Sequence, residues 1–379
     1  MKHYTFFEKK ANSLLKNSGI TINGQHPWDM QIYDNSLLVD VFLKGSLGLG
    51  DGYTNGKWEV EQIDTFFEKI IRSQTTFTPS IMDALYALRN TLLNTQMGRR
   101  AFAVGQKHYD LGNDLYRFML GESMGYSSGM FLHTKDTLTQ AQYNKFNHIC
   151  IKLQLKKGMK LLEIGSGWGT FAKHAIESYG VEVVGLTVSQ EQKIFAEKIC
   201  KGLPAKFLLL DYQKLDKKYE KYFDRVVSIE MIEAVGKKNL KTYFSTINYV
   251  LKDNGLLGLQ AIVGSGKDDT FLSTRIFPNG HVPSEKEIIA NSSHLLRIRL
   301  WESFGNDYDK TLLLWEENFR KQWKHIKEIK NTFGVKIYDE KFYRMWRYYL
   351  LLCAASFRVG LNDVTQVIMS KQNTLSSLR

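Results

Sequence analysis

The residues with the clearest capacity for chemistry follow a short apolar run and lie in the segment Leu161–Gly169, which reads LLEIGSGWG. This pattern predicts a strand that ends in a glycine-rich turn, where the backbone can come close to a ligand lying across the strand end. Glu163 precedes the first glycine by two positions, and an acidic side chain there suits a ligand that carries an ammonium or sulfonium charge. These features favour S-adenosylmethionine over a dinucleotide, whose fingerprint is G-x-G-x-x-G rather than the G-x-G-x-G found here.

Two more predicted strands end in polar side chains. The second runs into Thr187-Val-Ser-x-x-Gln192, where a ribose would lie, and the third ends at Asp211-Tyr-Gln213, which could frame an adenine. Three successive strand ends of this kind strengthen the prediction of an S-adenosylmethionine site. The residues predicted to bind this cofactor are Glu163, Gly165, Gly167, Trp168, Thr187, Val188, Gln192, Asp211, Tyr212 and Gln213.

The elements that must position these residues alternate between strands and helices. The sequence predicts helices at 146–153, 171–179 and 190–200, and strands at 160–164, 181–187, 206–210, 223–229 and 256–262. Such alternation is typical of a parallel sheet in a doubly wound α/β domain, here a Rossmann-like methyltransferase domain. The last third of the chain is predicted to be mostly helical.

Residues 1–100 are predicted to form a small N-terminal α+β domain, and residues 101–379 the catalytic domain. Helices are predicted at 6–16, 63–73 and 81–93, with the boundary at the basic segment 96–100. The glycine-rich segment Lys44–Gly52 resembles a phosphate-binding loop, but no Gly-Lys-Ser/Thr follows it, so we predict a structural turn.

The composition favours an anionic partner. The chain of 379 residues has 51 Lys+Arg against 39 Asp+Glu, a net charge of +12. No nucleic-acid-binding motif accompanies this charge, so an anionic membrane surface is the better candidate. The basic runs at 319–330 and 214–221 are each predicted to be solvated faces. Three scattered cysteines give no metal or disulfide framework, and with no signal peptide or spanning segment they predict a cytoplasmic protein.

The chain resembles the cyclopropane-fatty-acyl-phospholipid synthase family over most of its length. The segments that carry the resemblance are 45–53, 108–114, 124–128, 162–169, 228–233, 276–280, 304–308 and 353–358. Of these, His108-Tyr-Asp-x-Gly-Asn-Asp114 and Phe304-Gly-x-Asp-Tyr308 are the most specific. We predict that His108 and Asp110 fix a loop over the cofactor.

The resemblance implies an activity and partners. The family transfers a methylene group from S-adenosylmethionine to a cis double bond of a phospholipid acyl chain, which gives a cyclopropane ring. It also implies an N-terminal domain that engages lipid, peripheral association with the inner face of the membrane, and a homodimer. Two alternatives stay open, namely an enzyme that makes methyl- or methylene-branched chains and a non-catalytic lipid-binding paralogue.

The resemblance also implies site residues. Tyr126 and Ser127 match positions that touch the methionine end of the cofactor. A bicarbonate ion acts as the base in the family, and its binding groups match the side chains of Glu233 and Tyr308 and the carbonyl of Ile262. Ser128 and Gln260 stand where the family has a Cys and a His, and both keep a hydrogen-bond donor. Cys353 matches a cysteine once suspected as a nucleophile and is a further catalytic candidate.

The reaction that the resemblance implies needs a dry cavity. An alkene that attacks a methyl group leaves a carbocation, which water would trap. Aromatic faces can stabilise such a cation, and 22 Phe and 19 Tyr can supply them.

Overall fold

The structure, a computed structural model, describes residues 2–74, 112–278, 280–331 and 333–371. The chain divides into two compact units. The first comprises Met1–Asn94, Asp268–Pro278 and Tyr308–Asn362, and the second Thr95–Lys267, Asn279–Asp307 and Asp363–Arg379. The division at residue 100 stays a prediction. The expected helix at 81–93, the boundary at 96–100 and the pair His108 and Asp110 lie outside the described residues.

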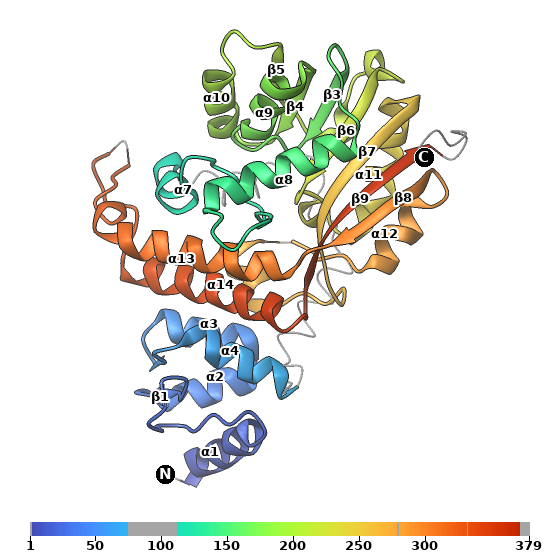
Figure 1. Cartoon of the computed structure of the whole chain (residues 1–379). Coiled ribbons are helices and arrows are strands. Elements are labelled where there is room, and N and C mark those ends of the chain that lie inside the picture. The colour runs from blue at the N-terminus through green and yellow to red at the C-terminus, as the bar shows by residue number, and fades with distance from the viewer. Residues whose placement is uncertain (1, 75–111, 279, 332, 372–379) are drawn as a thin grey trace. The chain divides into compact units, whose positions relative to one another are not determined.

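The second unit contains a mostly parallel seven-stranded sheet (Figure 1). Its strands lie in the order β5-β4-β3-β6-β7-β9-β8, and those from β5 to β7 run parallel. The chain leaves β3 for β4 on one side and returns to β6 on the other, which opens a crevice at the carboxyl ends of these strands. The strand bounds are β3 Lys160–Ile164, β4 Glu182–Thr187, β5 Ala205–Leu209, β6 Phe223–Ile229, β7 Leu251–Val263, β8 Leu296–Ser303 and β9 Asp363–Lys371.

Two hydrophobic cores cover the two faces of this sheet. Successive strand residues point to opposite faces, so Leu161 packs with helices α8, α9 and α10, whereas Leu162 packs with α11 and α12. Both faces are therefore buried, as a parallel sheet requires. The helices of this unit are α7 Asn113–Leu120, α8 Leu138–Lys152, α9 Thr170–Tyr179, α10 Gln190–Ile199, α11 Leu240–Val250 and α12 Glu285–Ser292.

The predicted α/β class is confirmed, with two differences in detail. The strands predicted at 160–164 and 223–229 have the predicted bounds. The last third is less helical than predicted, because it adds the strands β8 and β9, of which β9 pairs antiparallel to both β7 and β8. Helix α8 begins at Leu138, eight residues before the predicted start, where Thr137 and Gln140 form a capping box.

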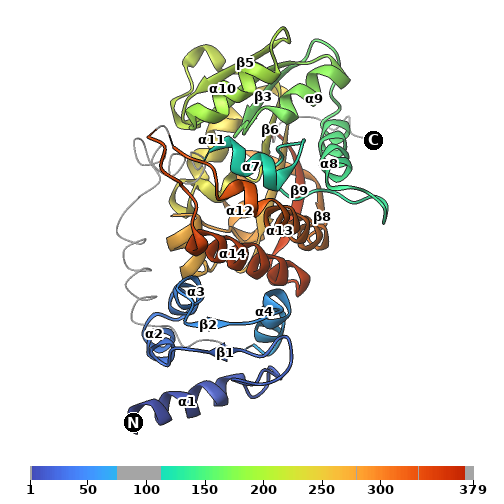
Figure 2. The same ribbon diagram turned by 90° about the vertical axis from the view of Figure 1, so that its left-hand side faces the viewer.

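The first unit combines the N-terminal elements with two long helices from the end of the chain. Helix α14 packs against α3 and α4, and Figure 2 shows the short strands β1 and β2 alongside α1–α4. Arg358 of α14 forms ion pairs with Asp64, Glu68 and Asp309. The elements are α1 Lys2–Leu15, β1 Gln31–Ile32, α2 Ser36–Lys44, α3 Ser46–Thr54, β2 Trp58–Glu59, α4 Ile63–Arg72, α13 Asn306–Ile326 and α14 Glu340–Arg358.

The prediction of a turn at the glycine-rich segment was wrong, because Ser46–Thr54 forms helix α3. Its glycines allow close packing rather than a reversal of the chain. A Cβ atom on Gly48 would lie 2.2 Å from the carbonyl oxygen of Asp40, and one on Gly50 would lie 2.2 Å from the ring of Phe271. Close contacts to other segments therefore stabilise this helix despite the low helix propensity of glycine.

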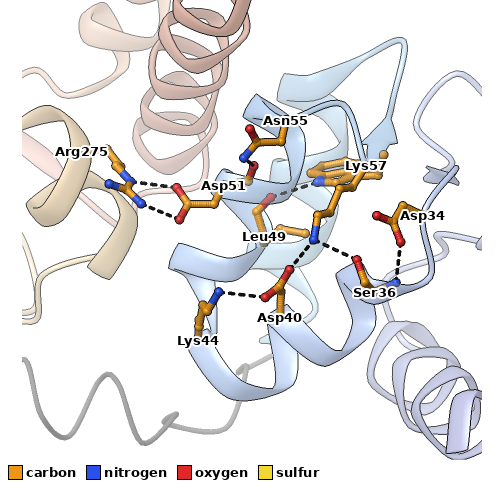
Figure 3. Close-up of polar contacts among 10 residues, drawn as sticks. Asp34, Ser36, Asp40, Lys44, Leu49, Asp51, Asn55, Lys57 and Arg275 are labelled. Carbon is orange, nitrogen blue, oxygen red and sulfur yellow. Dashed lines mark hydrogen bonds and ion pairs between the residues drawn. The ribbon is translucent and has the colours of Figure 1, made fainter.

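Polar contacts also join α3 to its neighbours in the first unit (Figure 3). Asp51 accepts two hydrogen bonds from Arg275, at 2.8 and 2.7 Å, while Asp40 accepts from Lys44 and Lys57. The pair of Asp51 and Arg275 attaches the segment 268–278 to helix α3, although the two residues are more than 200 positions apart in the sequence.

The basic stretch 319–330 has the predicted solvated face. Phe319 and Ile326 are fully buried, whereas Lys321, Lys324 and Lys327 are exposed. Among the residues that the structure describes, no helix is long and apolar enough to cross a bilayer.

We expect Gly50→Ala to lower the free energy of unfolding by about 1–3 kcal/mol, since the added methyl group overlaps the ring of Phe271. Denaturant unfolding measures this change. The cost should become smaller in a Phe271→Leu background, which removes the ring. An equal cost in both backgrounds would show that this contact does not explain the glycine.

Candidate active site

A cavity of about 190 Å³ lies in the second unit at the carboxyl ends of β3, β4 and β6. It is lined by nearly all of the residues predicted to bind the cofactor: Tyr126, Ser127, Glu163, Gly165, Gly167, Trp168, Thr187, Val188, Gln192, Asp211 and Tyr212. Gln213 is not among the lining residues, and its backbone N–H donates to Asp211 Oδ1 instead. The sheet thus brings together residues that are up to 86 positions apart in the sequence.

The glycine turn needs residues without side chains. Gly165 has a φ of 85° and Gly169 a φ of 82°, values that L-residues with a Cβ rarely adopt. A Cβ atom would also lie 2.7 Å from Met231 at Gly165 and 2.7 Å from Ala196 at Gly169. The turn therefore keeps the backbone close to the cavity and leads directly into α9.

Glu163 is a buried carboxylate that faces the cavity without a full set of partners. Its side chain is 3% exposed, and Oε2 has no hydrogen-bond partner among the described residues. Burial raises the pKa of Glu163 well above its usual value, because the charged form loses its hydration. A cation in the cavity would reverse this effect, so the residue fits the sulfonium or ammonium group of S-adenosylmethionine.

The end of β4 is fixed by a short chain of hydrogen bonds. Thr187 Oγ1 donates to Gln192 Oε1 at 2.8 Å, and the Ser189 side chain accepts from the N–H of Gln192 to cap α10. Tyr212 and Ser166 also line the cavity, and their hydroxyl groups lack partners among the described residues. These polar atoms are available to a bound nucleoside.

Aromatic rings form another part of the cavity wall. The indole N–H of Trp168 donates to Asn113 Oδ1 at 2.7 Å, and its ring lies 4.8 Å from that of Tyr116. Tyr116 in turn packs edge-on against Tyr126, with ring centroids 5.3 Å apart. Helix α7 therefore holds Trp168 and Tyr126 in place through one hydrogen bond and two ring contacts.

Helix α8 fixes the segment that carries Tyr126 and Ser127. Gln142 donates to the carbonyl of Ser127 at 2.8 Å, and the ammonium group of Lys145 donates to both the Ser127 hydroxyl and the Gln142 carbonyl. Lys145 is fully buried, which lowers its pKa to about 7, while the negative charge of Glu230 acts in the opposite direction. The structure thus places a buried lysine amino group near the carboxyl group of Glu230.

Glu230 follows β6 and lines the cavity. Its Oε1 atom accepts hydrogen bonds from the backbone N–H of Ser128 at 2.9 Å and from Gln260 Nε2 at 2.7 Å. The side-chain oxygen Oε1 of Gln260 accepts a hydrogen bond from Gln366 Nε2 at 2.9 Å, which orients the Gln260 amide. Glu230 also has a φ of 47°, a conformation that costs a non-glycine residue energy and is often found at functional sites.

Glu233 lies close to Glu230, and its side chain is half-buried with a buried Oε2 atom. Its Oε1 accepts from the backbone N–H of Ile262 at 2.6 Å, and Oε2 has no partner among the described residues. Burial and the nearby charge of Glu230 raise the pKa of Glu233 to about 8, so this carboxyl is mostly protonated at neutral pH. The two neighbouring carboxyl groups therefore do not both carry a charge at that pH.

Comparison with known proteins identifies the relatives of this chain. The family model for mycolic acid cyclopropane synthetase matches residues 96–367. The chain belongs to this family. It is 40% identical over 366 residues to the cyclopropane-fatty-acyl-phospholipid synthase of Escherichia coli K12, which covers 95% of this chain and 92% of that protein.

Two further proteins are similar to this chain, one from Mycobacterium tuberculosis and one with a solved structure. Tuberculostearic acid methyltransferase UfaA1 from that organism is 30% identical over 85% of this chain and 78% of its own length. The crystal structure of mycolic acid cyclopropane synthase CmaA1 with SAH and CTAB matches with a TM-score of 0.65 and 29% identity, over 72% of this chain and 98% of that one. The CmaA1 structure shows that the family fold holds SAH, the demethylated form of the cofactor.

Tyr308 and Cys353, two further predicted catalytic residues, belong to the first unit. The ring of Tyr308 packs 4.5 Å from that of Phe357 and 5.9 Å from that of Trp315. Burial raises the pKa of the Cys353 thiol, which favours the protonated and unreactive form. The catalytic roles of both residues stay predictions.

Three residues of the site were not predicted from the sequence: Gln142, Lys145 and Glu230. The first two lie in the part of α8 that precedes the predicted helix start, and the capping box at Thr137 was the signal that could have revealed them. Glu230 is the first residue after a correctly predicted strand, so its place at the carboxyl edge of the sheet was the available signal.

We expect Glu163→Gln to weaken S-adenosylmethionine binding about tenfold to 100-fold, because a charged hydrogen bond is replaced by a neutral one. The raised pKa of Glu163 means that the free protein must release a proton before its carboxylate can meet the cation. The affinity of the native protein for S-adenosylmethionine should therefore rise with pH until Glu163 is ionised. The difference in affinity between the native protein and the variant should widen over the same pH range. Calorimetric titrations at several pH values measure this, and a constant gap would contradict the assignment.

Proposed function

We propose that this protein transfers a methylene group from S-adenosylmethionine to the cis double bond of an unsaturated acyl chain in a membrane phospholipid, forming a cyclopropane ring. The observation that carries the proposal is the cavity, in which a buried carboxylate, one of whose oxygens has no partner among the described residues, and an aromatic wall meet at the carboxyl edge of the sheet. Membership of the family and 40% identity to a cyclopropane-fatty-acyl-phospholipid synthase support it.

When bound, S-adenosylmethionine supplies an electrophilic methyl group. The residues that line the cavity then have separate tasks. Glu163 pairs with the positive end of the cofactor, while Trp168 and Tyr126 present ring faces that stabilise positive charge without acting as nucleophiles. The buried lining keeps water away from the reacting carbon atoms.

The bicarbonate that the resemblance implies does not fit the side chains expected to hold it. The Ser128 hydroxyl donates to the carbonyl of Gly129, and the Gln260 amide is bonded at both its nitrogen and its oxygen. The carboxylate of Glu230 already accepts hydrogen bonds from two of these groups and disfavours a second anion beside it. Bicarbonate therefore has no part in the reaction proposed for this site.

We also propose that the protein associates peripherally with the inner, anionic face of the membrane from the cytoplasm. The net charge of +12 supports this, since each Lys or Arg near an anionic bilayer contributes about 1 kcal/mol. The lipid-engaging role of the N-terminal domain and the homodimer are further parts of the proposal.

A second candidate function is the formation of a methyl- or methylene-branched chain. It is favoured by the 30% identity to a tuberculostearic acid methyltransferase. The two functions share the methyl transfer and differ in the proton that is lost afterwards, so the structure of the product decides between them.

We expect vesicles of phosphatidylglycerol with cis-unsaturated chains to receive label from methyl-labelled S-adenosylmethionine, with ring protons visible by NMR of the recovered lipid. Vesicles with saturated chains are the matched control and should stay unlabelled. Branched-chain signals would establish the second candidate instead. A protein that binds the cofactor and the vesicles but transfers no label would be a lipid-binding paralogue.

A further inference from the structure

The groups expected to bind bicarbonate hold a side chain of the protein instead. Ser128 and Gln260 are both fully buried, and neither is among the residues that line the cavity. Glu230 lies between them and the cavity, where it is half-buried and forms part of the wall. An anion entering from the cavity would therefore meet the carboxylate of Glu230 before it reached these donors.

We propose that Glu230 is the base of this enzyme and that its carboxylate occupies the place of the bicarbonate ion. This inference rests on the proposed function. Two directed hydrogen bonds, from the Ser128 N–H and from Gln260 Nε2, fix one carboxylate oxygen. The side chain is thereby held in one orientation at the cavity wall, as a general base must be.

The charges around Glu230 suit this role. Two neighbouring carboxyl groups do not ionise together easily, and the buried position of Glu233 favours its protonated form. Glu230 lines the cavity whereas Glu233 does not, one oxygen of Glu230 accepts two hydrogen bonds, and the side chain of Lys145 lies near enough to interact with Glu230 electrostatically. The negative charge of the pair is therefore carried on the side that faces the cavity.

The proposed step removes a proton and closes the ring. After the methyl group has been added to one alkene carbon, the other carbon is cationic. An oxygen of Glu230 takes one proton from the added methyl group, and the electron pair of that C–H bond forms the third C–C bond of the ring. The cation is thereby neutralised, the carboxylate becomes a carboxylic acid, and the proton is later released to solvent.

Carbonate-free buffer tests this directly with the full-length native protein and unsaturated phosphatidylglycerol vesicles. We expect the native rate to be unchanged by removing bicarbonate or by adding it back. A native rate that falls on removal and returns on addition would overturn the proposal. Native protein that forms no lipid product even with bicarbonate present would instead count against the proposed function.

Variants of Glu230 provide the second arm. We expect Glu230→Gln to keep cofactor affinity, because the amide oxygen can still accept both hydrogen bonds, and to lose turnover by about 100-fold or more. Glu302→Gln is the matched control and should behave as native, because Glu302 pairs with His148 and Lys152 in the same unit and does not line the cavity. A Glu230→Gln variant with native turnover would refute the role.

Chemical rescue separates a base from a merely structural residue. Glu230→Ala leaves the Ser128 and Gln260 donors without their carboxylate and opens space for a small one. We expect formate or bicarbonate to restore its turnover in a concentration-dependent way while the native rate does not respond. A Glu230→Ala variant that binds the cofactor but gains nothing from either ion would overturn the proposal.

Discussion

The active site depends on how the protein holds negative charge away from water. Glu163 is buried, and Glu230 and Glu233 are half-buried, at one edge of the sheet, where a carboxylate that loses its hydration is costly. The surroundings of the three carboxyl groups differ. Glu163 has one oxygen without a hydrogen-bond partner among the described residues, Glu233 is favoured in its protonated form, and Glu230 accepts two hydrogen bonds with Lys145 nearby.

This arrangement is consistent with the two roles proposed for this edge of the sheet, binding a cation and accepting a proton. The unpaired oxygen of Glu163 interacts best with a positively charged ligand, so binding energy is directed to the sulfonium end of the cofactor. Glu230 approaches the cavity from the end of a different strand. Because β3 and β6 are neighbours in the sheet, the two carboxylates share one cavity without competing for one partner.

The first unit shows that the N-terminal segment does not build its core alone. Helix α14, from the other end of the chain, packs on α3 and α4, and its Arg358 joins Asp64 and Glu68 to Asp309. The segment 268–278 is attached through Arg275 and through the ring of Phe271. A substitution in the N-terminal helices will therefore affect packing with residues from near the end of the chain.

The sequence by itself determined the strands around the cavity and most of the residues that line it, because these depend on local patterns. Apolar runs followed by glycine or polar residues mark strand ends, and parallel strands bring their ends to one edge. The glycines of α3, the antiparallel strands β8 and β9, and the contacts of Glu230 were decided only by tertiary structure. Gly50 is required by a ring 221 positions away, and Glu230 is held by Ser128 and Gln260. Such contacts join residues that no local pattern relates, so they exist only once the chain has folded.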